Sequence, residues 1–221
     1  MSKEKNQSPV AGIVKDTLII FAITLVAGLV LGFVYELTKE PIEIQKMQKQ
    51  ADACAEVFKE ADESGNLKEV LPLHFEEVEV NGLAQNAVAK EYPDIKASVT
   101  EVYEARTEDD KLYGYVIAVE TKEGYGGVLR FYMGITMDGI LKGISILEIH
   151  ETPGLGMRAP EVLVPQFRNV TGPEFTVTKS GKTNDTEIDA ITSATITSKA
   201  VTRGVNYGMK YFEELKEGGI Q

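Results

Sequence analysis

The feature that most constrains this chain is an uninterrupted apolar segment near its N-terminus. Residues 17–35 read TLIIFAITLVAGLVLGFVY and contain no charged side chain. As a helix the segment would be about 28 Å long, which matches the hydrocarbon core of a bilayer. Because it is apolar on every face, a membrane helix fits it better than a buried core helix. We expect a transmembrane helix over residues 17–37, after an N-terminal tail of residues 1–16.

The alternative to a membrane anchor is a cleaved signal peptide. The apolar region of a signal peptide is usually about 7–15 residues long and ends at a small-residue cleavage site. Neither condition fits this segment well. Its orientation stays open, because lysines lie on both sides of it and the positive-inside rule therefore gives no preference. These lysines are Lys3, Lys5 and Lys15 before the segment, and Lys39, Lys46 and Lys49 after it.

The rest of the chain is acidic. The formal net charge is −11, and because acids and lysines balance within residues 1–37, the whole excess lies in residues 38–221. Nucleic-acid binding requires lysine and arginine to neutralise phosphates, so we expect no nucleic-acid partner. One cysteine and two histidines are too few for a disulfide or a recognisable zinc motif, so we also expect no metal site.

Residues 38–66 are expected to form an amphipathic connecting helix. Pro41 suits the first turn of such a helix. An apolar stripe follows at helical spacing, which predicts a buried Cys54 rather than a reactive thiol. The segment is expected to end near residues 63–66. The stripe consists of Ile44, Met47, Ala51, Cys54, Phe58 and Ala61.

The remaining residues, 67–221, are expected to form one α+β domain. Closely spaced segments rich in Val, Ile, Tyr and Phe, without helix-length insertions between them, predict a mainly antiparallel sheet. A later helix, from about Thr197 to Glu214, would pack on that sheet. The expected strands are residues 75–80, 97–106, 112–121, 128–137 and 140–149.

Three motifs interrupt this plan. GYGG, residues 124–127, and ETPGLG, residues 151–156, are typical of turns, the second with Pro153 and Gly154 as a type II pair. Neither has the spacing of a phosphate-binding P-loop or a dinucleotide fingerprint. The third, residues 189–201, is dense in hydroxyls directly before the last helix. It fits either a helix cap at Thr197 or, with the free N–H groups of a helix start, a phosphate site.

In this order, and after one membrane helix, the three motifs resemble the membrane-anchored FMN-binding domain family. The resemblance is to the G subunit of the Rnf ferredoxin:NAD oxidoreductase complex in particular, and the C subunit of the sodium-pumping NADH:quinone reductase is a close relative. Its sharpest part is the motif Asp-x-x-Ser/Thr-Gly/Ser-Ala-Thr, in which the family most often has Gly where Ser193 stands. The matching positions are Asp189, Thr192, Ser193, Ala194 and Thr195.

The resemblance implies that Thr195 carries FMN through a phosphoester, installed from FAD by a separate flavin transferase. Thr192, Ser193 and Ala194 would surround this site. Thr152 and Leu155 would touch the flavin ring or its ribityl chain. Gly126 and Gly127 would let the backbone approach the ring. The roles of four further residues stay open. Asp189 could contact the transferase or its magnesium, or be a turn residue, and Tyr125 could stack on the flavin ring or pack in the hairpin. Glu151 could simply hold its loop, and His150 could donate a proton to the flavin or have a structural or exposed role.

The function implied is that of an electron-carrying subunit of a membrane-bound ferredoxin:NAD oxidoreductase complex coupled to ion translocation. Such a chain would be a single-pass membrane protein with its large domain on the extracytoplasmic side. Its partners would be the other subunits, the flavin transferase and the lipid bilayer. The alternatives are the C subunit of the quinone reductase, a membrane-tethered binding or sensory module without redox work, and a secreted enzyme.

Overall fold

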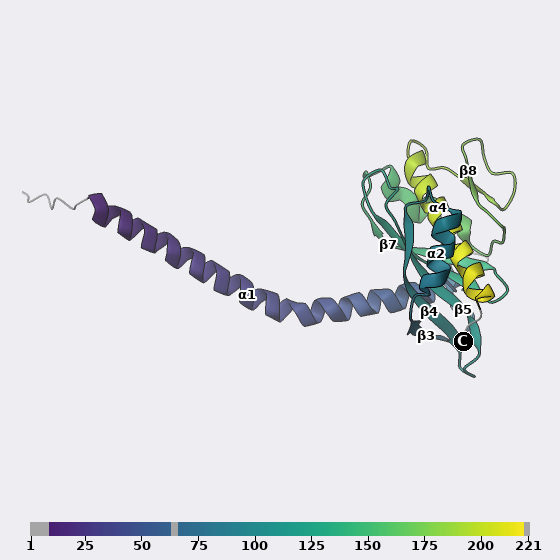
Figure 1. The fold of residues 1–221 in the computed structure, drawn as a ribbon, viewed down its shortest axis with the longest axis horizontal. Helices are drawn as coiled ribbons and strands as arrows, with labels where there is room; N and C mark the ends of the chain where they lie inside the picture. Colours follow the sequence, from purple (N-terminus) through teal and green to yellow (C-terminus); the bar gives the residue numbers. More distant parts are fainter. Residues whose placement is uncertain (1–8, 63–65, 219–221) are drawn as a thin grey trace, which may run out of the picture. The chain divides into compact units, whose positions relative to one another are not determined.

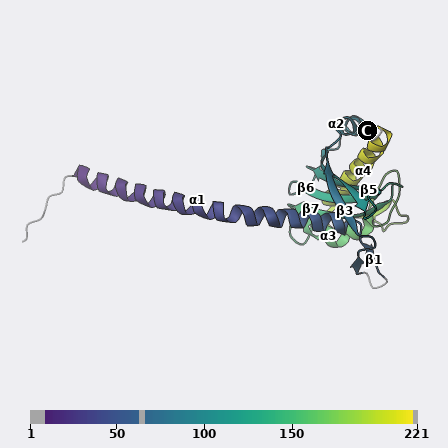
Figure 2. The same ribbon diagram turned by 90° about the horizontal axis from the view of Figure 1, so that it is seen from below.

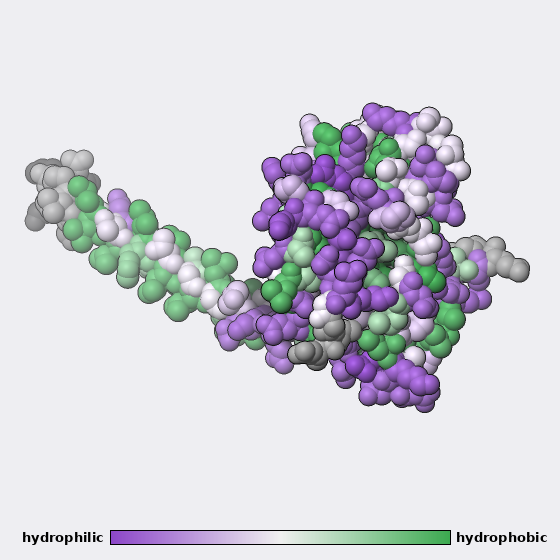
Figure 3. Space-filling model, turned by 45° about the vertical axis from the view of Figure 1, so that its right-hand side comes forward, coloured by the Kyte–Doolittle hydropathy of each residue, from purple (hydrophilic) through white to green (hydrophobic). Residues whose placement is uncertain are grey.

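The computed structural model describes residues 9–62 and 66–218, in two compact units, Met1–Lys49 and Gln50–Gln221. The first unit is the N-terminal part of helix α1, Pro9–Glu56, which by length and composition could cross a membrane (Figure 1). Its most apolar window has no residue buried inside the protein, which argues against a core helix. Figure 3 shows this run of exposed hydrophobic side chains. Pro41, expected in a first turn, lies inside α1, where its missing N–H leaves one helical hydrogen bond unmade.

The second unit is built on a five-stranded antiparallel sheet in the order β3-β4-β5-β6-β7. Figure 2 shows this unit from below. Neighbours in sequence are neighbours in the sheet, so the strands form a simple meander. This confirms the expected α+β class with a mainly antiparallel sheet. The strands are β3 (Leu73–Val78), β4 (Ala97–Thr107), β5 (Leu112–Thr121), β6 (Leu129–Thr136) and β7 (Leu141–Ile149).

Both faces of the sheet are covered. Along β5, Ile117 and Val119 belong to the larger core, which helix α4, Thr195–Glu217, covers. Val116 and Ala118 point to the opposite face and pack with residues 53–58. This alternation is the period of two that a strand imposes on its side chains. A strand buried on both faces reads as a nearly continuous apolar run, as β5 does.

The connection between the units differs from the expected helix of residues 38–66. Helix α1 ends at Glu56, and the compact domain begins at Gln50. The reason is packing, because Ala53 and Val57 are buried against the sheet beside Cys54 and Phe58. Ile44, Met47 and Ala51 of the expected stripe are exposed. Two short strands follow α1, β1 (Glu60–Ala61) and β2 (Leu67–Lys68). The helix was expected to end near residues 63–66, and residues 63–65 lie outside the described part of the chain.

A helix that the sequence did not predict lies between the first two strands of the sheet. Helix α2, Gly82–Glu91, packs on α4. Asn81 caps it, because its side chain accepts hydrogen bonds from the N–H groups of Leu83 and Ala84. Short elements connect β7 to α4: η1 (Gly156–Arg158), α3 (Ala159–Val162), η2 (Val164–Phe167), and the parallel pair β8 (Thr176–Thr178) and β9 (Glu187–Asp189).

Candidate functional site

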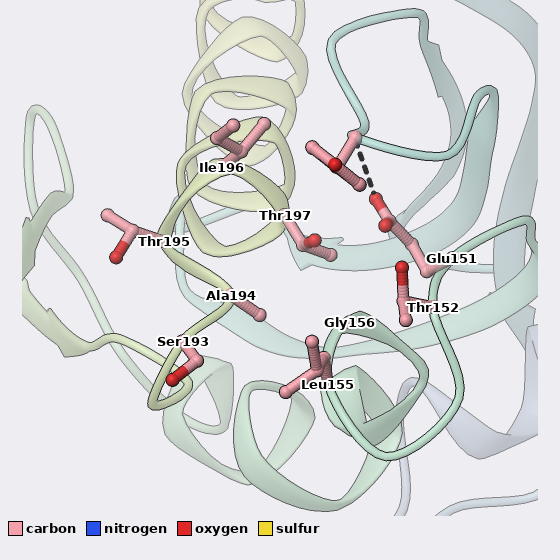
Figure 4. Close-up of a pocket in the computed structure, with 10 residues that line it drawn as sticks. Glu151, Thr152, Leu155, Gly156, Ser193, Ala194, Thr195, Ile196 and Thr197 are labelled. Atoms are coloured by element: carbon pink, nitrogen blue, oxygen red, sulfur yellow. Dashed lines mark hydrogen bonds between the residues drawn. The ribbon is translucent and has the colours of Figure 1, made fainter.

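A pocket of about 480 Å³ lies where the loop after β7 meets the start of α4. This volume is in the range of small-molecule sites, about 300–1,000 Å³. In Figure 4, Glu151 and Thr152 lie on one side of the opening, and Ser193 and Thr195 lie on the other. The lining residues are Tyr125, Glu151, Thr152, Leu155, Gly156, Ser193, Ala194, Thr195, Ile196 and Thr197.

The start of α4 is open to a ligand. The expected cap at Thr197 is wrong, because the helix begins two residues earlier and its N-cap is Ala194, which makes no side-chain hydrogen bond. Alanine has no oxygen with which to accept from the first N–H groups of the helix. These amides, at the positive end of the helix dipole, therefore face the pocket region without a side-chain cap and suit an anion.

Two serines shape the turn before this helix. Ser198 is buried, and its hydroxyl donates to the Ala194 carbonyl at 3.0 Å and accepts from the Ile191 amide at 2.9 Å. Ser193 has a φ of 65°, in the left-handed region that favours glycine.

Thr197 is a buried residue that also lines the pocket. It is 1% exposed, and among the described residues the hydroxyl has no hydrogen-bond partner. Gly156 lets the ETPGLG loop approach it. A Cβ on Gly156 would lie 2.7 Å from the Thr197 hydroxyl and 2.9 Å from Oε2 of Glu151. The sequence run contained this threonine, but nothing in the sequence placed it at the pocket.

The ETPGLG loop begins with the expected turn. The Leu155 amide donates to the Thr152 carbonyl at 3.1 Å, and Gly154 between them has a φ of 75°, as a type II turn requires. The turn places Thr152 and Leu155 at the pocket, as expected.

The GYGG loop, residues 124–127, forms another side of the site. Tyr125 lines the pocket and is 72% exposed, so its ring is not packed within the hairpin. Gly126 and Gly127 do not line the pocket. They make room for His150, since a Cβ on Gly126 would lie 2.2 Å from the His150 carbonyl oxygen. The Glu151 carboxylate accepts hydrogen bonds from the amides of Tyr125 and Gly126 at 2.8 and 3.2 Å.

The remaining candidates lie outside the pocket. Thr192 is exposed and is not among the lining residues. Asp189 ends β9, where Gln166 hydrogen-bonds its backbone, so it is not a turn residue. His150 contacts Glu148 at 2.7 Å on the surface. Within the described residues there is no group of three His, Cys, Asp or Glu that could hold a metal ion.

Of the eight expected cofactor residues, the pocket therefore contains Ser193, Ala194, Thr195, Thr152 and Leu155. It does not contain Thr192, Gly126 or Gly127. Gly156, Ile196 and Thr197 line it without having been expected there. Gly156 could have been found from the sequence, because it is the last glycine of the ETPGLG motif. No feature of the sequence indicated that Ile196 lines the pocket.

Comparisons with known proteins bear on the same segments. Residues 124–210 match the FMN-binding domain family, and residues 6–57 match the RnfG N-terminal region. The chain is 33% identical to the G subunit of the Na(+)-translocating ferredoxin:NAD(+) oxidoreductase complex of Acetobacterium woodii, over 98% of this chain and 99% of that protein. It is 31% identical to the G subunit of the proton-translocating ferredoxin:NAD(+) oxidoreductase complex of Clostridium ljungdahlii, over 93% and 92%.

Among solved structures, Shewanella oneidensis NqrC aligns with a TM-score of 0.44 at 21% identity, over 53% of this chain and 61% of that one. The two relatives from Acetobacterium and Clostridium, in contrast, match along nearly the whole chain, membrane segment and pocket motifs included. The chain therefore belongs to the family of G subunits of ion-translocating ferredoxin:NAD(+) oxidoreductase complexes, and its residues 124–210 form an FMN-binding domain.

Proposed function

We propose that this chain is the electron-carrying subunit of a membrane-bound ferredoxin:NAD oxidoreductase complex coupled to ion translocation, with FMN attached covalently to Thr195. The observation that supports this most is the position of Thr195. It is the first residue of α4, it lines the pocket, and it lies beside helix amides that no side chain caps. A phosphoester on its hydroxyl would put the phosphate charge at the positive helix end.

The residues present fit FMN. The phosphate would be held by the first amides of α4, and Ser193 and Ala194 would adjoin it. Thr197 is a buried residue that lines the pocket, so its hydroxyl is available to hydrogen-bond a bound polar ligand. Thr152, Leu155 and Tyr125 provide both polar and apolar surface for the ring and ribityl chain. When bound, FMN supplies the redox chemistry, and the protein supplies its position and electrostatic surroundings.

Attachment needs only one reactive group from this chain. The Thr195 oxygen would form the bond to phosphorus, AMP would leave from the diphosphate of FAD, and the hydroxyl proton would pass to solvent. A separate flavin transferase would catalyse the step. Neither electron transfer nor attachment requires a general base on this chain.

The proposal also includes a place in the cell. Residues 17–37 would span the cell membrane, with residues 1–16 in the cytoplasm and the FMN-binding domain on the extracytoplasmic side. The partners would be the lipid bilayer and the other subunits of the complex. The C subunit of the sodium-pumping quinone reductase is the second candidate. It is less well supported, because the relatives from Acetobacterium and Clostridium, which match along nearly the whole chain, are G subunits.

Fluorescence in a denaturing gel tests the attachment. The full chain, produced together with a flavin transferase, should give a fluorescent band under ultraviolet light. Thr195→Ala should abolish the fluorescence and leave membrane insertion intact. The control is Thr176→Ala, which removes an exposed threonine on β8, outside the pocket, and should leave the band fluorescent. A fluorescent Thr195→Ala band contradicts the assignment of the attachment site.

A further inference from the structure

We infer that Glu151 is a positioning residue that fixes the GYGG loop, residues 124–127, and thereby holds Tyr125 at the wall of the pocket. The inference concerns residues of this chain and their mutual contacts. Only its consequence for flavin rests on the proposed function.

The loop lies beyond the support of the sheet. The last paired residues of the β5–β6 ladder are Thr121 and Leu129, so the residues between them receive no cross-strand partner from that ladder. The amides of Tyr125 and Gly126 donate instead to the two carboxylate oxygens of Glu151, at 2.8 Å to Oε1 and 3.2 Å to Oε2. Hydrogen bonds to a charged acceptor are roughly twice as strong as bonds between neutral groups.

The glycines of the loop are what allow this contact. A Cβ on Gly124 would lie 3.0 Å from Oε1 of Glu151 and 2.4 Å from the Gly127 carbonyl. A Cβ on Gly126 would collide with the His150 carbonyl at 2.2 Å. The loop therefore lies directly against the backbone of residues 150–151, with the Glu151 carboxylate inserted beneath it.

The same carboxylate also borders the other walls of the pocket. Glu151 Cβ and Oε2 lie 2.8 and 2.9 Å from the point that a Gly156 Cβ would occupy, next to the Thr197 hydroxyl. Glu151 thus lies where the GYGG loop, the ETPGLG loop and the first turn of α4 converge. Figure 4 shows its hydrogen bond on one side of the pocket. No other carboxylate of the described residues lines this pocket.

The consequence for the cofactor follows from Tyr125. Its ring is exposed and borders the pocket, so its position depends on the loop backbone rather than on core packing. If FMN occupies the pocket as proposed, Glu151 acts on the flavin through Tyr125. Loss of Glu151 and loss of Tyr125 should then change the same property of the flavin.

Amide hydrogen exchange tests, without flavin, whether Glu151 fixes the GYGG loop; we call this contact the Glu151 clamp. The full chain in detergent, with Thr195→Ala to prevent loading, is compared with the same chain carrying Glu151→Ala. We expect exchange in the peptide of residues 122–129 to become about tenfold faster or more, since local opening sets the rate. The matched control is Glu148→Ala, a surface carboxylate at the end of β7 that contacts His150, which should leave this peptide unchanged. Glu151→Gln keeps the size and one acceptor oxygen, and should give an intermediate rate if Glu151→Ala fails to fold.

Flavin emission in the loaded native protein tests the consequence. A phenol ring in contact with an excited flavin quenches its emission, so Tyr125→Ala and Glu151→Ala should each raise it. The double variant should raise it no further than Tyr125→Ala alone, because residues acting as one unit are not additive. If Glu151→Ala leaves the amide exchange rate of residues 122–129 unchanged, Glu151 does not fix the loop. If the changes in flavin emission of Tyr125→Ala and Glu151→Ala add up in the double variant, Glu151 does not act through Tyr125. A wild-type chain without flavin contradicts the proposed function instead, while the exchange result still decides the clamp.

Discussion

At the scale of single residues, the turn into α4 depends on a serine in an unusual backbone conformation. Ser193 has a φ of 65°. This conformation is sterically unfavourable for most residues that have a Cβ atom, whereas glycine adopts it without that cost. Its short polar side chain tolerates this conformation better than a β-branched one. The turn leaves Ala194 at the N-cap and Thr195 at the first helical position.

This backbone predicts two opposite substitution effects. Ser193→Gly should leave the free energy of unfolding nearly unchanged, because two effects oppose each other. Glycine adopts positive φ without strain, but it also increases the conformational entropy of the unfolded state. Ser193→Val should lower it by about 1–3 kcal/mol, because a β-branched residue is strained there. Denaturant unfolding of the two variants measures the difference. Equal stability of Ser193→Val and wild type would show that the turn relaxes without cost.

The sequence predicted the residues of the site better than their individual roles. The resemblance to the FMN-binding domain family implied a site at Thr195 and Ser193, and both residues line the pocket. The motifs did not show that Ala194, without an oxygen, takes the cap position, because the start of a helix is set by the dihedral angles of residues 193–194. They also missed that Gly126 and Gly127 face His150, since close backbone contacts between distant segments leave no local signal.

At the scale of elements, two glycines let the end of α1 dock on the sheet. Gly134 and Gly143 are paired across β6 and β7, and Val57 packs over them. A Cβ on Gly134 would lie 2.7 Å from Cγ2 of Val57, and one on Gly143 would lie 3.1 Å from its carbonyl oxygen. The sheet surface is thus flat where the buried chain crosses it.

Gly134→Ala should therefore lower the free energy of unfolding by about 1–3 kcal/mol through overpacking. Adding Val57→Ala should recover part of that loss, since it removes the methyl group that clashes. Gly82→Ala, with nothing within 4 Å of the new Cβ, is the control and should be neutral or stabilising. Thermal unfolding of the four chains provides the comparison, and an unaffected Gly134→Ala would refute the packing argument.

The same face of the sheet holds a half-buried carboxylate network. Glu101 accepts hydrogen bonds from Tyr132 at 2.5 Å and Tyr103 at 3.1 Å, and pairs with Arg130. Burial alone would raise the pKa of Glu101, but these hydrogen bonds and the arginine charge outweigh burial and lower it.

A pH dependence of stability follows. Because the pKa of Glu101 is lower in the folded state, its contribution is present above the unfolded value of about 4.3 and is lost as the pH falls through the folded value. The difference in free energy of unfolding between wild type and Glu101→Gln should be largest near neutral pH and shrink in acid. Denaturant titrations at several pH values measure it, with the exposed Glu108→Gln as control. A difference that grows in acid would contradict this direction.

The elements that the sequence predicted well are those with strong periodic patterns. β4 and β5 match their expected ranges to within one residue, because buried β-branched and aromatic residues define them. Helix α2 was missed because NGLAQNAVAKE has only two large apolar residues, Leu83 and Val88, and its clearest signal was the capping Asn81. The end of α1 was misplaced because burial of Ala53 and Val57, and not the regular stripe, decides where the helix docks.

At the scale of the whole molecule, the chain combines a helix suited to a membrane with an acidic domain suited to water. The apolar N-terminal helix and the acidic domain are separate compact units, and lysine counting does not orient them. The proposed orientation places the domain outside the cytoplasm.

Labelling of a single introduced thiol tests this orientation. Leu83 is 83% exposed on α2, whereas the native Cys54 is 2% exposed and should stay unlabelled. In intact cells, or in spheroplasts where an outer membrane blocks the reagent, a membrane-impermeant maleimide should label Leu83→Cys and leave wild type unlabelled. Labelling only after cell lysis would place the domain in the cytoplasm.

The central claim is that Thr195 carries the flavin. Mass spectrometry of the peptide containing Thr195, from the full chain produced with its transferase, tests it most directly. We predict a peptide heavier by the mass of FMN less one water, with fragment ions that place the addition on Thr195. An unmodified Thr195 in a protein that retains covalent flavin on another residue would contradict it.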